Sequence, residues 1–309
     1  MSPFFLKARK ELAPDRVRAD YLSAEQYMTG CDQVWSTDRR SDRRQDRSAP
    51  CPGQVVYFKS DHTEGFFRQL AGVRSRVVCV SAESDDTISE RQPIPPQVGA
   101  WFSVNSVHPH VRAIPLGLGN SYCAVTAKAP ELAGLAECAK PGLLYLNFNP
   151  STNPTVRLPL WETYADPAKA EWATCRNGGT EKTTYLQELA SHRFVLCPEG
   201  NGIDTHRMWE ALYVGTIPIV RRHPALSGFS DLPILFVDSL HNINRNDLLE
   251  TERLFVNKEW NYEKLFVSYW LQAIRKEKQK LIVRGQKLSI PKYFLTRCLR
   301  SILVQKLIQ

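Results

Sequence analysis

Residues 193–220 most constrain how this chain can fold, because a short strand, a glycine-rich loop, a helix and a second strand follow one another directly. Phe194–Cys197 is an apolar run typical of a buried parallel strand. The loop at residues 199–202 contains two glycines free to adopt positive φ. Gly215 stands where the C-terminal cap of the helix belongs, and residues 216–220 form the next strand. The segment therefore predicts one β–α–β unit of a parallel sheet.

The same segment has the chemistry of an anion site. Asp204 or Thr205 can cap the helix N-terminus, where unpaired N–H groups and the positive end of the helix dipole suit a phosphate. Arg207, in the first turn, adds a guanidinium for phosphate oxygens. Glu210, three residues further on, shares its face and can accept hydrogen bonds from ribose hydroxyls. The alternative is that Arg207 and Glu210 form a surface ion pair beside an ordinary loop, and we favour the ligand interpretation.

These residues also carry a resemblance to a known family. The run F-V-L-C-P-E-G-N-G-x-D-T-H-R-x-W-E-A-L-x-x-G-T-I-P-I-V resembles the donor-binding segment of exostosin-type glycosyltransferases. A similar strand–loop–helix occurs in fucosyltransferases. The resemblance is strong over residues 193–220 and weaker over roughly 54–240. It implies the GT-B fold, an α/β architecture of two Rossmann-like domains facing a cleft, with a nucleotide sugar held by the C-terminal domain. It also implies that Glu210 binds the ribose and that Arg207 binds the diphosphate.

The N-terminal half shows strands that alternate with helical or irregular crossovers. The expected strands are residues 54–59, 76–80, 99–104 and 111–115, with a helix at 63–71. This alternation predicts a parallel sheet, in which ligands bind beyond the carboxyl ends of the strands. Polar clusters follow each of these strands, so the sequence predicts that they line the cleft.

An inverting transfer of a sugar needs a base for the acceptor hydroxyl. Asp61 and His62 directly follow the first of these strands, and Asp85 follows the second. These three are the predicted catalytic residues, with Asp61 and Asp85 leading. Glu83 and Asp86 also follow the second strand, and His108 and His110 follow the third. Such loops are mostly just solvated, and the sequence does not choose among them.

The second domain is expected to begin near Lys140, with residues 142–148 as its first strand. The resemblance places the loop after this strand near the donor phosphates, which makes Arg157 a second diphosphate ligand. The alternative is an exposed arginine without a ligand. The predicted donor site comprises Arg157, Glu199, Gly200, Asn201, Gly202, Asp204, Thr205, Arg207 and Glu210.

A length of 309 residues suits two domains of about 100–150 residues each. We expect an acceptor-side domain at 1–125, a nucleotide-sugar domain at 140–260 and a basic helical segment at 261–309. The resemblance implies that the C-terminal helices return to pack on the N-terminal domain, and Trp260–Ile274 should join the core. Residues 290–309 combine an apolar face with basic side chains, so contact with an anionic membrane surface and packing on the protein both stay open.

The formal net charge of +8 and a pI near 9.1 favour an anionic partner: a nucleotide sugar, an anionic membrane or nucleic acid. The arginine-rich run at 38–47 should be a surface loop. Interleaved aromatics, a helix-turn-helix and a zinc site are all lacking, so no nucleic acid is expected. A Rossmann-like protein that binds nucleic acid or an anionic membrane without transferase activity remains the rival hypothesis, and a catalytically silent relative is a third.

The eight cysteines form no C-x-x-C pair, and we expect free thiols in a reducing compartment, with a disulfide or two as the alternative. No D-x-D motif is present, so the transfer is predicted to need no cofactor or metal. Neither a signal peptide nor a run of about 18 apolar residues is recognisable. A cytoplasmic location is expected, with peripheral attachment to a membrane left open. The sequence thus predicts a glycosyltransferase that uses a nucleotide-sugar donor and a glycan or glycolipid acceptor.

Overall fold

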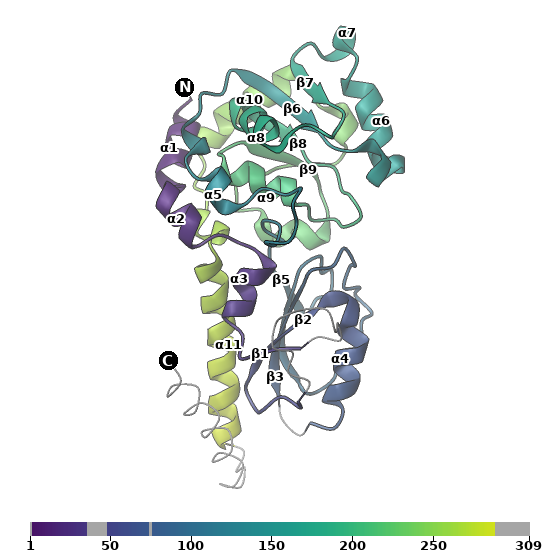
Figure 1. Cartoon of the computed structure of the whole chain (residues 1–309), viewed down its shortest axis with the longest axis vertical. Helices are drawn as coiled ribbons and strands as arrows, with labels where there is room; N and C mark the ends of the chain where they lie inside the picture. The colour runs from purple at the N-terminus through teal and green to yellow at the C-terminus, as the bar shows by residue number, and fades with distance from the viewer. Residues whose placement is uncertain (1, 36–47, 74–75, 288–309) are drawn as a thin grey trace.

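The structure, a computed structural model, describes residues 2–35, 48–73 and 76–287 and contains two α/β lobes (Figure 1). Each lobe is built on a five-stranded sheet whose strands all pair in parallel. The strands are β1 (Gln33–Val34), β2 (Val55–Lys59), β3 (Val77–Ala82), β4 (Val98–Ser103), β5 (Val111–Ala113), β6 (Gly142–Asn147), β7 (Ala173–Arg176), β8 (His192–Leu196), β9 (Ile217–Arg221) and β10 (Leu235–Val237). The predicted α/β class with two Rossmann-like sheets is confirmed.

Helices flank both sheets. They are α1 (Pro3–Glu11), α2 (Pro14–Ala19), α3 (Ala24–Thr29), α4 (Thr63–Leu70), α5 (Ala129–Leu132), α6 (Pro154–Tyr164), α7 (Pro167–Ala170), α8 (Lys182–Ser191), α9 (His206–Tyr213), α10 (Arg245–Val256) and α11 (Val267–Lys287).

The N-terminal lobe has the strand order β1-β2-β3-β4-β5 and buries both faces of its sheet. Along β2, Val56 and Phe58 point to one face and pack in a cluster under α4, where the rings of Phe58 and Phe66 stack at 4.5 Å. Val55 and Tyr57, which alternate with them, belong to the larger core on the other face. A sheet buried on both faces explains why its strands read as nearly continuous apolar runs.

The C-terminal lobe has the strand order β10-β9-β8-β6-β7. Its central strand β8 leads through the glycine loop into α9 and then into β9, as the sequence predicts. Gly215 lies between α9 and β9 with φ of +68°, a conformation that favours glycine. The chain therefore places the glycine loop at the carboxyl edge of the sheet, where ligands of parallel sheets bind.

The last described helix, α11, returns to the N-terminal lobe and runs along it (Figure 1). Arg112 of β5 pairs with Glu277 at 2.7 Å, and Lys278 pairs with Asp32 at 2.6 Å. Core residues extend over 260–274, as expected. Residues 38–47 and 290–309, on which the surface-loop and membrane expectations rest, lie outside the described residues.

The first helix differs from the predicted domain division. Although residues 1–125 were assigned to the N-terminal domain, α1 packs against α10 of the C-terminal lobe. The rings of Phe4 and Phe255 lie 6.0 Å apart, and Lys7 pairs with Glu259 at 3.1 Å. The chain therefore starts on one lobe, builds the other and returns, which fastens the two lobes together.

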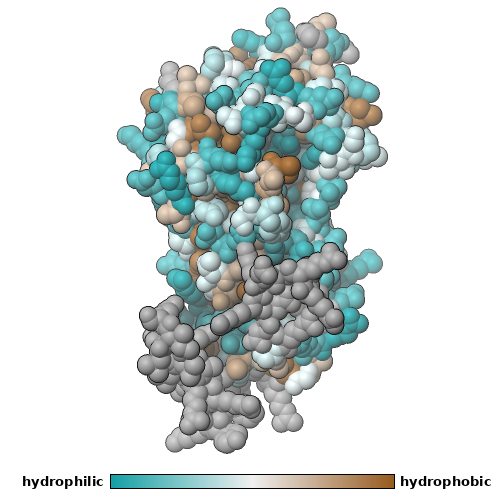
Figure 2. Space-filling model, in the orientation of Figure 1, coloured by the Kyte–Doolittle hydropathy of each residue, from teal (hydrophilic) through white to brown (hydrophobic). Residues whose placement is uncertain are grey.

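The surface of the C-terminal lobe seen in Figure 2 is mostly hydrophilic, with hydrophobic residues in small scattered groups. Such scattered groups are normal for a globular surface. Among the described helices, none has the length and apolarity needed to cross a bilayer.

Candidate functional site

A cavity of about 990 Å³ opens between the two lobes, at the carboxyl ends of both sheets. The N-terminal side contributes Ala24, Asp61, Glu83, Ser84, Asp85, Leu116, Leu118, Asn120 and residues 122–126. The C-terminal lobe contributes residues 147–149, Thr152, Arg157, residues 178–180, Lys182, Tyr185, residues 200–202, residues 204–207 and Glu210. The predicted cleft is therefore present, and all predicted site residues except His62 and Glu199 line it.

Arg157 is buried in the wall of this cavity. It lies in α6, a helix that begins with Pro154, and not in the loop where the sequence placed it. Its guanidinium donates to the backbone oxygen atoms of Glu199 at 3.0 Å, Pro198 at 3.3 Å and Asn149 at 3.4 Å. Burial, followed by the charge of Arg207, lowers the pKa of Arg157 to about 10, so it remains protonated at neutral pH. Arg157 thus holds the glycine loop in place and adds a buried positive charge beneath it.

Arg207 lies in the first turn of α9 and lines the same cavity. Its Nε atom is buried and has no hydrogen-bond partner among the described residues. Among the described residues, no carboxylate oxygen lies within 4.0 Å, the limit for an ion pair, of Arg157 or Arg207. An unpartnered buried donor costs free energy unless a ligand satisfies it. Two neighbouring guanidinium groups without a carboxylate are therefore suited to binding an anion.

Glu210 is buried one turn further along α9. One carboxylate oxygen accepts a hydrogen bond from the backbone N–H of Ala127 at 2.9 Å, and the other accepts one from the Tyr185 hydroxyl at 2.6 Å. The surface ion pair with Arg207, the alternative left open above, is wrong because Glu210 is buried and held by these donors. A carboxylate has about four acceptor positions, so both oxygens can still accept hydroxyl groups from the cavity.

Asp204 joins the two lobes. Its carboxylate accepts hydrogen bonds from the Leu116 backbone N–H at 2.9 Å and from Trp209 Nε1 at 2.8 Å. Its own backbone N–H donates to Asn105 Oδ1 at 2.9 Å. Of the two residues predicted to cap α9, Thr205 occupies the N-cap position, although its side chain makes no capping hydrogen bond, and Asp204 does not cap the helix. Asp204 instead docks the glycine loop against the strand ends of the N-terminal lobe.

This docking should depend on pH. Burial raises the pKa of Asp204 to about 7. A carboxyl group whose pKa is higher in the folded chain stabilises it below the unfolded pKa of about 4, and this contribution is lost as the pH rises through 7. Asp204→Asn lacks this titration, so the melting temperature of the wild type minus that of the variant should be larger at pH 5 than at pH 8. Asp238→Asn is the control and should show no such trend, because the Asp238 side chain is exposed. If the difference in melting temperature between the wild type and Asp204→Asn were the same at pH 5 and pH 8, the proposed role of Asp204 would be wrong.

The glycines of the loop are needed for space. The sequence suggested positive φ for Gly200 and Gly202, and neither residue adopts it. A Cβ at Gly200 would lie 2.8 Å from an Arg157 nitrogen, and one at Gly202 would lie 3.0 Å from Asn105 Nδ2. Both positions therefore allow the loop to approach neighbouring polar groups closely.

Three other loop residues take different places. Asn201 is exposed at the tip of the loop and lines the cavity, as does Thr205. Glu199 does not line the cavity, because its carboxylate pairs with Arg221 at 2.7 Å. Its backbone oxygen still accepts from Arg157, so Glu199 supports the loop from behind.

Only two of the three predicted catalytic residues lie on the opposite wall of the cavity. Asp61 and Asp85 are exposed and line the cavity. The Asp85 carboxylate lies 3.2 Å from where a Cβ would stand on Gly202, so it faces the glycine loop. The ring of His62 lies 6.5 Å from that of Trp35, against the N-terminal lobe and outside the cavity lining. The structure thus brings the two aspartates, and not the histidine, to the site.

Glu83, which the sequence analysis ranked below the aspartates, is the most constrained acidic residue of this wall. Its φ is +60°, a strained value for a residue with a side chain. Its carboxylate accepts from the hydroxyls of Tyr57 at 3.0 Å and Tyr122 at 2.8 Å and from Asn120 Nδ2 at 2.5 Å. The only signal for Glu83 in the sequence is its place directly after β3, because its donors come from distant segments.

No cluster of three or more His, Cys, Asp or Glu side chains suited to a metal ion occurs in residues 2–35, 48–73 and 76–287. The cysteines of these ranges are free, as expected.

No family model and no curated protein matches this chain. Solved structures similar to it include one described as an α1,3-fucosyltransferase with GDP and one described as an α1,3-fucosyltransferase. Both are 12% identical with a TM-score of 0.36; the first match covers 83% of this chain and 95% of the other, and the second covers 84% and 94%. Neither description names an exostosin-type enzyme.

Proposed function

We propose that this protein is a glycosyltransferase that moves a sugar from a nucleoside diphosphate to a hydroxyl of a glycan or glycolipid acceptor without a metal ion. One observation carries the proposal: Arg157 and Arg207, neither paired with a carboxylate among the described residues, meet at the glycine loop in the wall of the cavity between the lobes. Two guanidinium groups provide the positive charge that a leaving diphosphate requires. Glu210, on the same face of α9, then accepts the ribose hydroxyls.

In the proposed reaction, the bond between the anomeric carbon and the phosphate oxygen breaks, and its electron pair leaves with the diphosphate. A new bond forms from an acceptor hydroxyl oxygen to the same carbon, and the hydroxyl proton passes to a base. Asp61 and Asp85 are exposed on the opposite wall and are the proposed bases. Both aspartates line the cavity that contains the donor groups, and reach to the reacting hydroxyl is the first requirement for a base.

The direct test is to incubate the purified protein with a panel of nucleotide sugars and to measure release of the nucleoside diphosphate, with and without a metal chelator. Release with one donor that persists in the chelator supports the proposal. Asp61→Asn and Asp85→Asn should separate the base from the donor site, because loss of the base lowers turnover by about 10²–10⁴-fold and leaves donor binding unchanged. Binding of no nucleotide sugar would contradict the whole assignment. The rival hypothesis of nucleic-acid or membrane binding rests on the arginine-rich run at 38–47, which lies outside the described residues, and on the basic C-terminal segment, which is described as far as residue 287.

The acceptor side of the cavity presents apolar surface next to Glu83. Tyr122 is 67% exposed and Val125 is 88% exposed, and both line the cavity. An exposed ring beside hydrogen-bonding groups suits a sugar, which has apolar C–H faces and polar edges. We propose that this segment supports the acceptor.

Tyr122→Ala should lower the rate of transfer to the acceptor by about 10-fold, the cost of losing one aromatic contact. Hydrolysis of the donor should not change, because that reaction needs no acceptor. Tyr122→Phe, which keeps the ring and removes the hydroxyl bonded to Glu83, separates stacking from hydrogen bonding. Leu254→Ala on α10 is the control, since Leu254 is 63% exposed and does not line the cavity. Equal loss of hydrolysis and transfer in Tyr122→Ala would rule out an acceptor role.

A further inference from the structure

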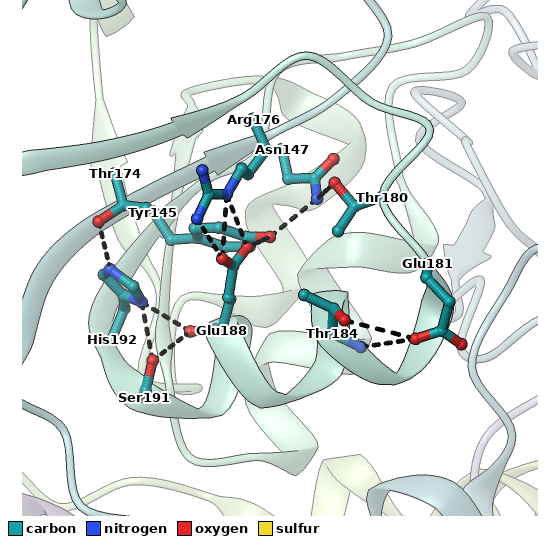
Figure 3. Close-up of polar contacts among 10 residues, drawn as sticks. All are labelled: Tyr145, Asn147, Thr174, Arg176, Thr180, Glu181, Thr184, Glu188, Ser191 and His192. Atoms are coloured by element: carbon teal, nitrogen blue, oxygen red, sulfur yellow. Dashed lines mark hydrogen bonds and ion pairs between the residues drawn. The ribbon is translucent and has the colours of Figure 1, made fainter.

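The wall of the cavity in the C-terminal lobe ends in a polar network that the proposed phosphate and ribose contacts do not use (Figure 3). Asn147, the last residue of β6, is buried and lines the cavity. Thr180, in the loop between β7 and α8, lines it beside Asn147. The two side chains are joined by a hydrogen bond of 3.0 Å from Asn147 Nδ2 to the Thr180 hydroxyl oxygen.

The donor and acceptor roles in this network follow from the ion pair of Arg176 and Glu188. Arg176 pairs with Glu188 at 2.6 Å, and its hydrogen bonds lower the pKa of that carboxyl, which is therefore ionised and only accepts. Tyr145 must then donate its one proton to Glu188, at 2.8 Å. The Tyr145 oxygen can only accept from Asn147, at 2.8 Å, so the atom facing it is the amide nitrogen.

Both N–H groups of Asn147 are consequently used inside the protein, by Tyr145 and by Thr180. No hydrogen bond within the described residues reaches Oδ1 of Asn147. The Thr180 oxygen accepts from the amide, and its own proton makes no described hydrogen bond. The network therefore presents a fixed acceptor and a free donor side by side on the cavity wall.

The backbone next to this pair leaves room for a flat group. Gly178 and Gly179 adopt φ of +59° and +63°, and apart from its neighbours in the chain no heavy atom lies within 4 Å of where a Cβ would stand on Gly179. Lys182 also lines this end of the cavity and pairs with Glu131 at 2.6 Å.

A line of contacts connects this place to the proposed ribose site. The Tyr185 hydroxyl bonds to Glu210, and its ring lies 6.2 Å from that of Tyr145, which bonds to Asn147. Two aromatic residues thus separate the carboxylate at the ribose from the free amide oxygen. A nucleoside has the same order of parts, with its base beyond the ribose.

We infer that Asn147 and Thr180 read the base of the donor nucleotide and select an edge where a ring N–H stands next to a carbonyl oxygen, as in uracil and guanine. This inference rests on the proposed function. Asn147 Oδ1 accepts the ring N–H, and the Thr180 hydroxyl donates to the carbonyl. Adenine and cytosine place an unprotonated ring nitrogen and an amino group at this edge.

Calorimetric titration of the protein with UDP, GDP, ADP, CDP and inorganic pyrophosphate tests the inference. UDP or GDP should bind the wild type more tightly than ADP and CDP. Asn147→Ala and Thr180→Val should each weaken that preferred ligand by about 10-fold, the value of one hydrogen bond at a buried site, and should leave pyrophosphate unchanged. Thr174→Val is the matched control, because Thr174 bonds to His192 at 2.9 Å in the same network and does not line the cavity.

The outcomes separate the two proposals. If the wild type binds no nucleoside diphosphate, the proposed function fails and the inference fails with it. If it binds UDP or GDP and both variants bind them as tightly, only the inference fails. Tight binding of ADP or CDP by the wild type would also overturn the inference that the site selects a base edge with a ring N–H next to a carbonyl oxygen. Equal weakening of pyrophosphate in both variants would show a general loss of structure and would overturn base reading as well.

Discussion

Replacing Arg207 with alanine should weaken the binding of a nucleoside diphosphate by about 10- to 100-fold, the value of hydrogen bonds to a charged group. Turnover should fall further, by about 10²–10³-fold, because charge grows on the diphosphate as it leaves. The reason is specific to this site: Arg207 Nε is buried without a partner, so its hydrogen bond becomes available only when an anion binds. Calorimetry and release of the diphosphate measure the two effects separately.

Two further variants sharpen this result. Arg207→Lys keeps the charge but loses the planar fork, so its affinity should fall between those of the wild type and the alanine variant. Arg222→Ala is the control, because Arg222 is exposed, pairs with Asp238 at 3.2 Å and does not line the cavity. If Arg207→Ala bound the diphosphate as tightly as Arg222→Ala does, the anion site would have to lie elsewhere.

The parts of the fold that the sequence predicted are those with a local cause. The apolar run that became β8, the loop that follows it and Gly215 each act on their neighbours in the chain, so the unit around α9 follows from residues 193–220 alone. Polar residues such as Asp85 reached the cavity because parallel strands bring their carboxyl ends to one edge.

The parts that could not be predicted depend on contacts between distant segments. Arg157 was expected in the loop after the strand at 142–148, yet Pro154 starts α6, and this helix carries Arg157. Glu210 is fixed by Ala127 and Tyr185, which are 83 and 25 residues away. The sequence near Asp204 does not indicate that the Asp204 carboxylate accepts a hydrogen bond from the backbone of Leu116.

Lys140 is another residue whose role depends on contacts between distant segments. Its replacement should have the largest effect on the stability of the fold. This buried residue precedes β6, and its ammonium donates to the backbone oxygens of Ala190 at 2.8 Å and Val214 at 2.9 Å, and to the Thr216 hydroxyl at 2.9 Å. Ala190 lies at the end of α8, and Val214 directly follows α9. The last carbonyls of a helix lack partners within the helix and carry its negative dipole end. One lysine therefore closes both helices.

Lys140→Met keeps most of the volume and removes the donor, so it should lower the free energy of unfolding by about 2–4 kcal/mol, because two buried carbonyl oxygens lose their partner. Denaturation in urea measures this change. Lys7→Met is the matched control: Lys7 forms a surface ion pair with Glu259 at 3.1 Å, and such pairs contribute about 0–1 kcal/mol. Because α9 also carries Arg207 and Glu210, Lys140→Met should bind nucleoside diphosphate less tightly although it touches no ligand. Equal stability of the two variants would show that water replaces the ammonium at these helix ends.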